Sequence, residues 1–527
     1  MPLRSLKAVL MSHVVDSSLR NTLQGAALVL LGVLFGGALS FAAKILIARN
    51  TTQAEFGIYT LLVALVAIYS HVANAGLQEG TPRFISIFQG EGRHTDAGGV
   101  AKASFLLGAL FSVSSWPLLF LLADFISVHI FHKPQLAGPL RIISFSIPFL
   151  VLAQNAAGIL RGYKIIAPKV YFLDAGMPLC LLLSLCAGFL FSFGFAGVLY
   201  SHLFSALVTF TLLVRYGYRT TGLNLLSPTG STHGSQLLAF SFPLLVGSLM
   251  VMLLGWTDTL VLGRYVEARL VGVYHVSVTL ATLSLLPLSA LEYVFMPIAG
   301  ELYGRRQYGE LGRVYQILAK WSFAGTLPIF FLLFLFPGEL IRVIFGHGFQ
   351  DACLPLRILA LGFLFHIFLG PNGILMVVVG KPREILNLSI AAAAFNISLN
   401  YVLIRVGGYG MVGASLATVI TYVVLNVAVS ILVFRKSRIH PLTAPSLRAA
   451  GSAFALVLIF LLAKHALEPS FWMVPVYVLV FIGTLVLSLF VTRSVDLEDR
   501  ILLRTLMEKT GVDLNLIRGI AGRFRSG

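Results

Sequence analysis

The sequence predicts an all-α, polytopic membrane protein with about fourteen transmembrane helices. Three observations support this fold class: 57% of the residues are hydrophobic, only 11% are charged, and the mean hydropathy is +0.90. A soluble protein carries roughly 25% charged residues, so a water-soluble core could not hide this much apolar surface. Because lipid offers no hydrogen-bond partners, the long apolar stretches must form helices that pair their own backbone groups.

A helix needs about 20 mostly apolar residues to cross a bilayer. Such stretches are expected at 24–46, 55–76, 99–123, 138–160, 168–191, 196–214, 237–262, 270–296, 316–337, 354–378, 385–404, 411–433, 447–464 and 472–492. With the N-terminus in the cytoplasm, 28 of the 38 Lys and Arg residues fall on the cytoplasmic side. Basic residues favour that side. We therefore expect both termini in the cytoplasm. The net charge of +17 then reflects the concentration of basic residues on the cytoplasmic side of the membrane rather than nucleic-acid binding.

An internal repeat organises the predicted helices. The matched residues are Arg49, Gly57, Tyr59 and Pro82 with Arg264, Gly272, Tyr274 and Pro297 at an offset of 215, followed by Pro139, Arg141, Gly194 and Gly197 with Pro355, Arg357, Gly410 and Gly413 at 216. Any one match could arise by chance, but several in register indicate a duplication.

The repeat predicts four segments. Residues 1–230 form an N-lobe with helices 1–6, 231–440 a C-lobe with helices 7–12, 441–492 two extra helices, and 493–527 an amphipathic cytoplasmic tail. Six helices is an even number, so both lobes enter the membrane with the same orientation and are related by a pseudo-twofold axis along the membrane normal. We expect a cleft between helices 1 and 7 and transport by alternating access; the alternative is that the duplicated bundle is only a scaffold.

Local motifs add a family resemblance. Glu55-Phe56-Gly57-Ile58-Tyr59 follows helix 1, Pro82-Arg83-Phe84-Ile85 ends helix 2, and Tyr409-Gly410-Met-Val-Gly413-Ala-Ser-Leu-Ala-Thr418 joins helices 11 and 12. In order and spacing these motifs resemble the polysaccharide transporter family of Wzx-type flippases. That family lies within the multidrug/oligosaccharidyl-lipid/polysaccharide exporter (MOP) superfamily. The resemblance covers most of 24–435 and implies a MATE-like fold.

The resemblance also implies a function. A protein of this family flips a lipid-linked oligosaccharide of the polyprenyl-diphosphate type across the prokaryotic cytoplasmic (inner) membrane for cell-surface polysaccharide biosynthesis. Its implied partners are membrane lipids, the lipid-linked oligosaccharide, a polysaccharide polymerase and glycosyltransferases. The alternatives within the superfamily are a proton- or sodium-coupled drug or cation exporter and a lipid II-type flippase. A membrane-embedded glycosyltransferase would need a large extramembrane loop, and the predicted loops are short.

Six residues are candidates for substrate binding. Lys44, Arg49 and Arg264 are placed to attract a diphosphate, because arginine binds phosphate oxygens in a fixed fork. Alternatively, Arg49 and Arg264 sit at the membrane surface with their side chains extended to water. Gln154, Asn155 and Asn372 lie in corresponding stretches of helices 4 and 10. They either bind sugar hydroxyls or bind neighbouring helices.

Four further residues are candidates for coupling or gating. Asp258 is expected at the same depth on helix 7 as Lys44 on helix 1, so the two could form a salt bridge that is either a gate or a static pair. Asp174 and Glu292 could exchange protons or pair with bases such as Lys169 or Arg305. His366 could serve proton coupling or be a satisfied hydrogen-bonding residue.

No catalytic, nucleotide-binding or metal-ligand spacing is evident in the sequence. We therefore expect a transporter without a cofactor or metal and not an enzyme, with H⁺ or Na⁺ as its coupling ion.

Overall fold

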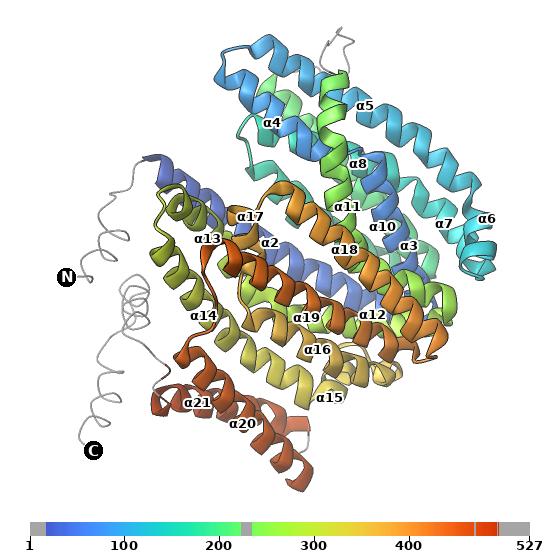
Figure 1. The fold of residues 1–527 in the computed structure, drawn as a ribbon. Coiled ribbons are helices and arrows are strands. Elements are labelled where there is room, and N and C mark those ends of the chain that lie inside the picture. Colours follow the sequence, from blue (N-terminus) through green and yellow to red (C-terminus); the bar gives the residue numbers. More distant parts are fainter. Residues whose placement is uncertain (1–16, 223–233, 468–470, 493, 495–527) are drawn as a thin grey trace. The chain divides into compact units, whose positions relative to one another are not determined.

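The computed structural model describes residues 17–222, 234–467, 471–492 and 494, and Figure 1 shows that these residues are overwhelmingly helical. Thirteen helices in this described part are long and apolar enough to cross a bilayer. A fourteenth span is obtained if α7 and α8, which meet at a bend of 44°, count as one. The expected fold class of an all-α membrane protein with about fourteen spans is confirmed.

The chain groups into two compact units, which are described separately. The first contains the described residues up to Ala281 together with Leu340–Leu359 and Lys381–Leu425, and the second contains Thr282–Glu339, Ala360–Gly380 and the described residues from Asn426 onward. The lobe boundaries predicted at 230 and 440 follow the sequence repeat and not this grouping, and they stay a prediction. The predicted amphipathic tail at 493–527 lies outside the described residues, apart from Ser494.

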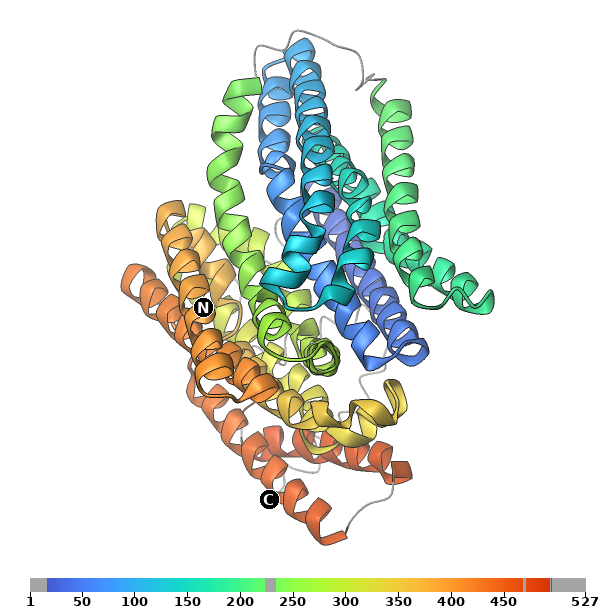
Figure 2. The same cartoon turned by 90° about the vertical axis from the view of Figure 1, so that its right-hand side faces the viewer.

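The first unit holds most of the helices. Its complete elements are α2 (Ser17–Asn50), α3 (Gln53–Ala73), α4 (Leu77–Gly90), α5 (His94–Leu121), α6 (Ala123–Phe125), η1 (Ile126–Ile130), η2 (Pro134–Leu136), α7 (Ala137–Ser144), α8 (Ser146–Gly162), η3 (Lys169–Gly176), α9 (Met177–Leu190), α10 (Gly194–Thr221), α11 (Gly234–Tyr265), α12 (Ala268–Ala281), η5 (His347–Ala352), α18 (Pro382–Asn400) and η6 (Tyr401–Val406). In Figure 2, α11 is the long green helix beside α4, which is blue. Helix α11 packs against α3, α4 and α18, and α12 packs against α3.

The second span is broken in its middle. Helix α3 ends at Ala73, and the next two turning residues, Ala75 and Gly76, have φ angles of 52° and 73°. The buried Asn74 holds the break: its Nδ2 donates to Asn155 Oδ1 on α8 at 3.0 Å, and its Oδ1 accepts from the backbone N–H of Gln78. Because the side chain replaces backbone partners lost at the break, irregular backbone is tolerated inside an apolar span.

A π-helical segment, η3, begins the fifth span. Its i→i+5 hydrogen-bond pattern places residues five apart above one another. Helix α2 packs closely against it through Gly32 and Gly36: a Cβ at Gly32 would lie 2.0 Å from Val170 Cγ1, and one at Gly36 would lie 1.7 Å from the Asp174 carbonyl oxygen. Glycines four residues apart are a common means of close helix approach in membranes.

The second unit joins the two extra helices to α14. Its complete elements are η4 (Thr282–Leu285), α13 (Leu286–Gly304), α14 (Tyr308–Leu335), α17 (Asn372–Val379), α20 (Ala444–Leu467), η7 (Phe471–Met473) and α21 (Val474–Val491), whereas α15 (Pro337–Ile344), α16 (Cys353–Phe368) and α19 (Gly410–Ser437) are shared between units. Phe331 on α14 stacks on Phe481 of α21, with ring centroids 4.0 Å apart. Phe460 of α20 meets both rings edge-on. Aromatic packing therefore attaches helices 13 and 14 to α14.

Candidate functional site

The two repeat-equivalent arginines each cap a segment of the other repeat. Arg49, at the end of α2, donates from Nε to the carbonyl of Ile344 at 2.8 Å and also donates to the carbonyl of Val343. Arg264, near the end of α11, donates to the carbonyls of Ile130 and, at 3.2 Å, His129. Residues 343–344 lie 214 positions after 129–130, one residue short of the repeat offset of 215, so the two contacts are near-equivalent under the repeat. Both guanidinium groups thus serve helix-end carbonyls that would otherwise lack partners.

Two repeat-equivalent glycines complete the reciprocal contact. A Cβ at Gly57 on α3 would lie 1.8 Å from the Ala268 carbonyl oxygen on α12, and a Cβ at Gly272 on α12 would lie 2.5 Å from the Gln53 carbonyl oxygen on α3. Gln53 and Ala268 are themselves 215 residues apart. Each glycine therefore lies against the start of the helix that carries the other, as a pseudo-twofold axis between α3 and α12 requires. We call the Arg49, Arg264, Gly57 and Gly272 contacts the reciprocal lock.

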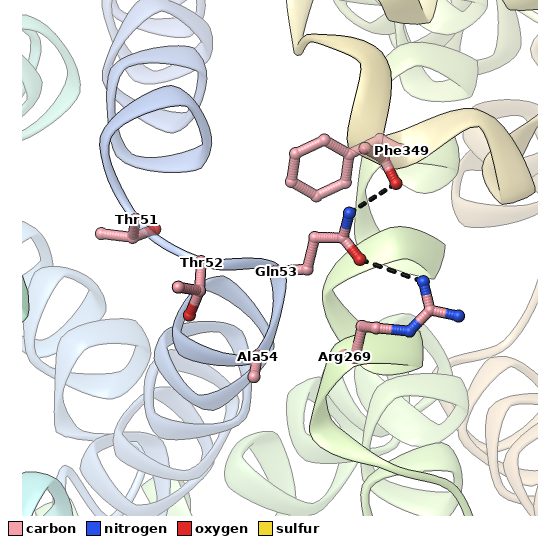
Figure 3. Close-up of a pocket in the computed structure, with 7 residues that line it drawn as sticks. Thr51, Thr52, Gln53, Ala54, Arg269 and Phe349 are labelled. Atoms are coloured by element: carbon pink, nitrogen blue, oxygen red, sulfur yellow. Dashed lines mark hydrogen bonds between the residues drawn. The ribbon is translucent and has the colours of Figure 1, made fainter.

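A cavity of about 480 Å³ lies beside the lock (Figure 3). Its lining includes Gln53, whose Nε2 donates to the Gly348 carbonyl at 2.5 Å and whose Oε1 accepts from Arg269 at 3.1 Å. Arg269 also pairs with Asp351 at 3.3 Å, with both side chains about half exposed. This bridge has no copy in the other repeat, because the residue equivalent to Gln53 there is Ala268, which has no side-chain amide.

Asp258 is a buried carboxylate surrounded by neutral donors. Its side chain accepts hydrogen bonds from Tyr274 Oη at 2.7 Å, from Asn400 Nδ2 at 2.9 Å and from the Thr418 hydroxyl. These donors come from α12, α18 and α19, and Asp258 itself is only 7% exposed. The hydrogen bonds replace much of the water that the carboxylate loses on burial.

The polar network around Asp258 continues along α18. Asn400 also donates to the Asn396 carbonyl at 3.0 Å, and Asn396 donates to Thr421 on α19 at 3.2 Å. Asn400 Oδ1 is buried and has no hydrogen-bond donor. The site therefore offers a carboxylate and an unused amide oxygen side by side, both of which attract a cation.

The salt bridge proposed between Lys44 and Asp258 is not formed among the described residues, so a static pair is not what the structure shows, and its role as a gate stays a prediction. Sequence reasoning placed the two charges at one depth, but Asp258 is directed toward α12, α18 and α19. Lys44 is partly buried and forms no hydrogen bond or salt bridge among the described residues. Lys44 is thus a cation without an anionic partner on the first span, where an unpaired charge is costly, and it stays a candidate for substrate binding.

A second polar site lies between α4, α8 and η3. Arg161 donates to Glu79 at 3.0 Å and to the Gln78 carbonyl at 2.9 Å, and Lys169 pairs with Asp174 at 3.1 Å. Asp174 therefore has the basic partner that was one of its two expected roles. Residues 169 and 174 are five apart, so the π-helical winding of η3 brings the two charges onto one face.

The three amide candidates have different surroundings. Asn155 is fully buried and links Asn74 to α5 through the Ser104 carbonyl, and Asn372 donates to the Asn426 carbonyl and to Ser430 at 3.2 Å each. Both bind neighbouring helices, the commoner of the two expected roles. Gln154 lines the polar site instead, and its Oε1 is buried without a partner.

The remaining coupling candidates lie in the second unit. His366 Nδ1 lies 2.8 Å from Asn426 Oδ1, which is the hydrogen-bonded arrangement expected if His366 is structural. Pairing with Arg305, one of the two roles considered for Glu292, is not formed in the structure, because Arg305 binds Glu301 one turn away at 2.7 Å. Glu292 has no ion pair or hydrogen bond among the residues that the structure describes.

Sequence reasoning missed the donors around Asp258. Tyr274 and Thr418 were noted only as motif residues, and Asn396 and Asn400 were not noted at all. One signal could have found the asparagines: they are four apart within an apolar span, so they share one helix face. No group of three or more His, Cys, Asp or Glu side chains in the described part could hold a metal ion.

Solved structures share the fold of this chain. The chain resembles the lipid II flippase MurJ in an inward closed conformation, with a TM-score of 0.71 and 14% identity over 90% of this chain and all of that one. It also resembles an inward-facing multidrug resistance MATE transporter of the MOP superfamily, with a TM-score of 0.66 and 16% identity over 78% of this chain and 99% of that one. These similarities establish the MOP-superfamily fold.

The sequence then specifies the family. Residues 46–354 match the polysaccharide biosynthesis protein family, which covers more than half of the chain, and the protein belongs to that family. A relative from Haloferax volcanii, named probable low-salt glycan biosynthesis flippase Agl15, is 22% identical over 437 residues, which are 80% of this chain and 87% of the relative. The resemblance noted in the sequence is confirmed.

Proposed function

We propose that the protein flips a lipid-linked oligosaccharide of the polyprenyl-diphosphate type from the cytoplasmic to the outer leaflet of a prokaryotic cytoplasmic membrane. Membership of the polysaccharide biosynthesis family carries this proposal, and the glycan flippase from Haloferax volcanii supports it. Both termini lie in the cytoplasm under this proposal. The substrate comes from glycosyltransferases and passes to a polysaccharide polymerase.

The reciprocal lock supports transport by alternating access. Its contacts join the two repeats where α2 leads into α3 and α11 leads into α12, so they hold that end of the protein closed. With the N-terminus in the cytoplasm, this is the outer end. In the transport cycle the lock breaks when the substrate leaves and forms again for the next one.

Lys44 supports an anionic substrate. It is the partly buried cation on the first span that has no anionic partner in the described part of the chain. A diphosphate would supply that partner, whereas a cationic drug would be repelled. This observation favours a phosphate-bearing lipid over a drug. A lipid II-type flippase remains the second candidate, because its substrate also carries a diphosphate and MurJ shares the fold.

Asp258 is the proposed coupling residue. A buried carboxylate with only neutral donors around it can bind H⁺ or Na⁺ without first releasing a fixed cation. For a test, wild-type and Asp258→Asn proteins are compared in vesicles that carry a fluorescent polyprenyl-diphosphate sugar. We expect the asparagine variant to stay folded, because it keeps most hydrogen bonds, and to lose the dependence of flipping on the ion gradient. If flipping by the variant depended on the H⁺ gradient and on the Na⁺ gradient as in the wild type, Asp258 would be excluded as the coupling residue.

Depletion in the native host tests the proposal as a whole. We expect a lipid-linked oligosaccharide to accumulate in the cytoplasmic leaflet, and a plasmid copy of the wild-type gene to clear it. A Lys44→Gln copy should clear it poorly, whereas a Lys102→Gln copy, altered outside the first span, should act as wild type. If no glycolipid accumulated and drug sensitivity rose instead, the flippase proposal would be overturned in favour of an exporter.

A further inference from the structure

We propose that the outer end of α11 carries a diphosphate-binding site, in which Arg264 and Arg405 hold the head group of the lipid after it has been flipped. This inference rests on the proposed function, because it assigns the diphosphate of the substrate to one place on the outer side. The site is built around Tyr265, the last residue of α11, where α11 packs against η6.

Two guanidinium groups lie against the ring of Tyr265. The Cζ atom of Arg264 is 5.6 Å from the ring centroid, and that of Arg405 is 5.9 Å from it. Tyr401, which is 48% exposed, meets the same ring edge-on at 6.1 Å. Contact with an aromatic ring stabilises each cation, but the two positive charges repel each other. An anion that binds both arginines would offset this repulsion.

Both arginines have unused hydrogen-bond donors. The two lock contacts of Arg264 use the same atom, Nη1, so its Nε and Nη2 donors have no acceptor among the described residues. Arg405 is exposed and makes neither a hydrogen bond nor an ion pair within the described part of the chain. Arginine binds phosphate oxygens in a fixed fork, so two arginines match the two phosphate groups of a diphosphate.

The surrounding charges favour an anion over a cation. Lys133 is only 6% exposed, and its Nζ donates to the carbonyls of Gly263 and, at 3.3 Å, Phe131. It therefore adds positive charge next to Arg264 without bringing a carboxylate. Glu267 is the nearest acidic residue along the chain. It attracts Lys133 but forms no ion pair with any residue that the structure describes.

Arg141 is a contrasting arginine on the outer side. It also lies over an aromatic ring, with its Cζ 5.8 Å from the ring centroid of Phe120, but its guanidinium group donates to the carboxylate of Asp124. Contact with a ring is therefore not what distinguishes Arg264 and Arg405. The difference is that neither has a carboxylate partner, although basic residues are disfavoured on the outer side. This arrangement points to an anionic ligand.

The site belongs to the second repeat alone. At the repeat offsets, the equivalents of Tyr265 and Arg405 are Asn50 and Phe189. Arg49 therefore lacks the second arginine, although it makes the same kind of lock contact as its counterpart in the second repeat. This asymmetry supplies a matched control, because a change at Arg49 removes lock contacts without altering the site.

Arginine modification of the full-length protein in lipid nanodiscs tests the site. Phenylglyoxal reacts with exposed guanidinium groups, and mass spectrometry reports its rate at each arginine. The probe is inorganic pyrophosphate, with sulfate at equal ionic strength for comparison. We expect pyrophosphate at ten times its half-protecting concentration to slow the reaction of Arg405 about tenfold, and to leave the reaction of Arg141 unchanged. Sulfate should protect neither.

The matched variants are Arg264→Gln and Arg49→Gln. Arg264→Gln should raise the pyrophosphate concentration that half-protects Arg405 about tenfold, as expected for the loss of charge-assisted hydrogen bonds. Arg49→Gln should leave that concentration unchanged. Equal effects of the two variants, equal protection by sulfate, equal protection of Arg405 and Arg141, or no protection of Arg405 would overturn the proposal.

A further comparison identifies the source of the phosphate groups. Nanodiscs of phosphatidylcholine alone are compared with nanodiscs that also contain either phosphatidylglycerol or geranylgeranyl diphosphate. We expect geranylgeranyl diphosphate to slow the modification of Arg405, and phosphatidylglycerol to have little effect. Protection by phosphatidylglycerol alone would assign the site to a membrane phospholipid and overturn its assignment to the substrate.

The outcome is separable from that of the proposed function. If pyrophosphate fails to protect Arg405 but depletion still causes glycolipid to accumulate, the outer diphosphate site is wrong and the flippase proposal stands. If pyrophosphate protects Arg405 and depletion causes no accumulation, the protein binds diphosphate at this site but does not flip the proposed substrate.

Discussion

Replacing Gly57 by alanine is expected to open the reciprocal lock. The new Cβ would lie 1.8 Å from the Ala268 carbonyl oxygen, whereas ordinary van der Waals contact begins at 3.4 Å, so α3 and α12 must separate by about 1.6 Å. Neither partner can yield cheaply, because the clash is with backbone and not with a flexible side chain. Extra atoms in a packed contact typically cost about 1–3 kcal/mol. That cost would change the ratio of open to closed protein by about 5- to 150-fold.

The opening can be measured by the reactivity of a thiol at the contact. Val271 is fully buried on α12 next to Gly272, so a Val271→Cys protein without other cysteines should react slowly with a water-soluble maleimide. Adding Gly57→Ala should accelerate labelling. Gly37→Ala on α2 is the matched control, because a Cβ there has no neighbour within 4 Å. If the two alanine variants elute as folded protein and label equally slowly, the lock is not held by this contact.

Two further predictions follow from the described contacts. Arg49→Ala and Arg264→Ala should each accelerate maleimide labelling of Val271→Cys to a similar degree, because each removes hydrogen bonds to two carbonyls. A large effect of one variant and none of the other would contradict a symmetric lock. Lys464→Met should lower the free energy of unfolding by about 1–3 kcal/mol, because Glu339 and the Leu335 carbonyl lose a partly buried partner at 2.9 and 2.6 Å. Thermal unfolding in detergent checks this, and adding Glu339→Gln should recover part of the loss.

The sequence predicted the features that depend on hydrophobicity and on repetition. The spans are long runs of apolar residues, so each can be located from the hydropathy along the sequence. The pairs Arg49 and Arg264, and Gly57 and Gly272, could be matched because duplication kept their spacing. That match also predicted the twofold relation that the lock displays.

The pairing of polar residues inside the membrane could not be predicted in the same way. Sequence gives the depth of Lys44 and Asp258 along their helices, but not the direction in which each side chain points. A rotation of α11 by half a turn would bring Asp258 from one neighbour to another without any change in hydropathy. The same limit applies to Asp174, whose contact with Lys169 depends on π-helical winding that apolar periodicity does not reveal.

The reciprocal lock has a consequence for how the protein arose. Residue 57 of one repeat touches residue 268 of the other, and residue 272 touches residue 53, so the contact is isologous like that of a twofold homodimer. An ancestral six-helix subunit could therefore have closed against a second copy of itself before the gene was duplicated. The Gln53 bridge to Arg269, which only one side possesses, is the point at which the two halves of this contact differ.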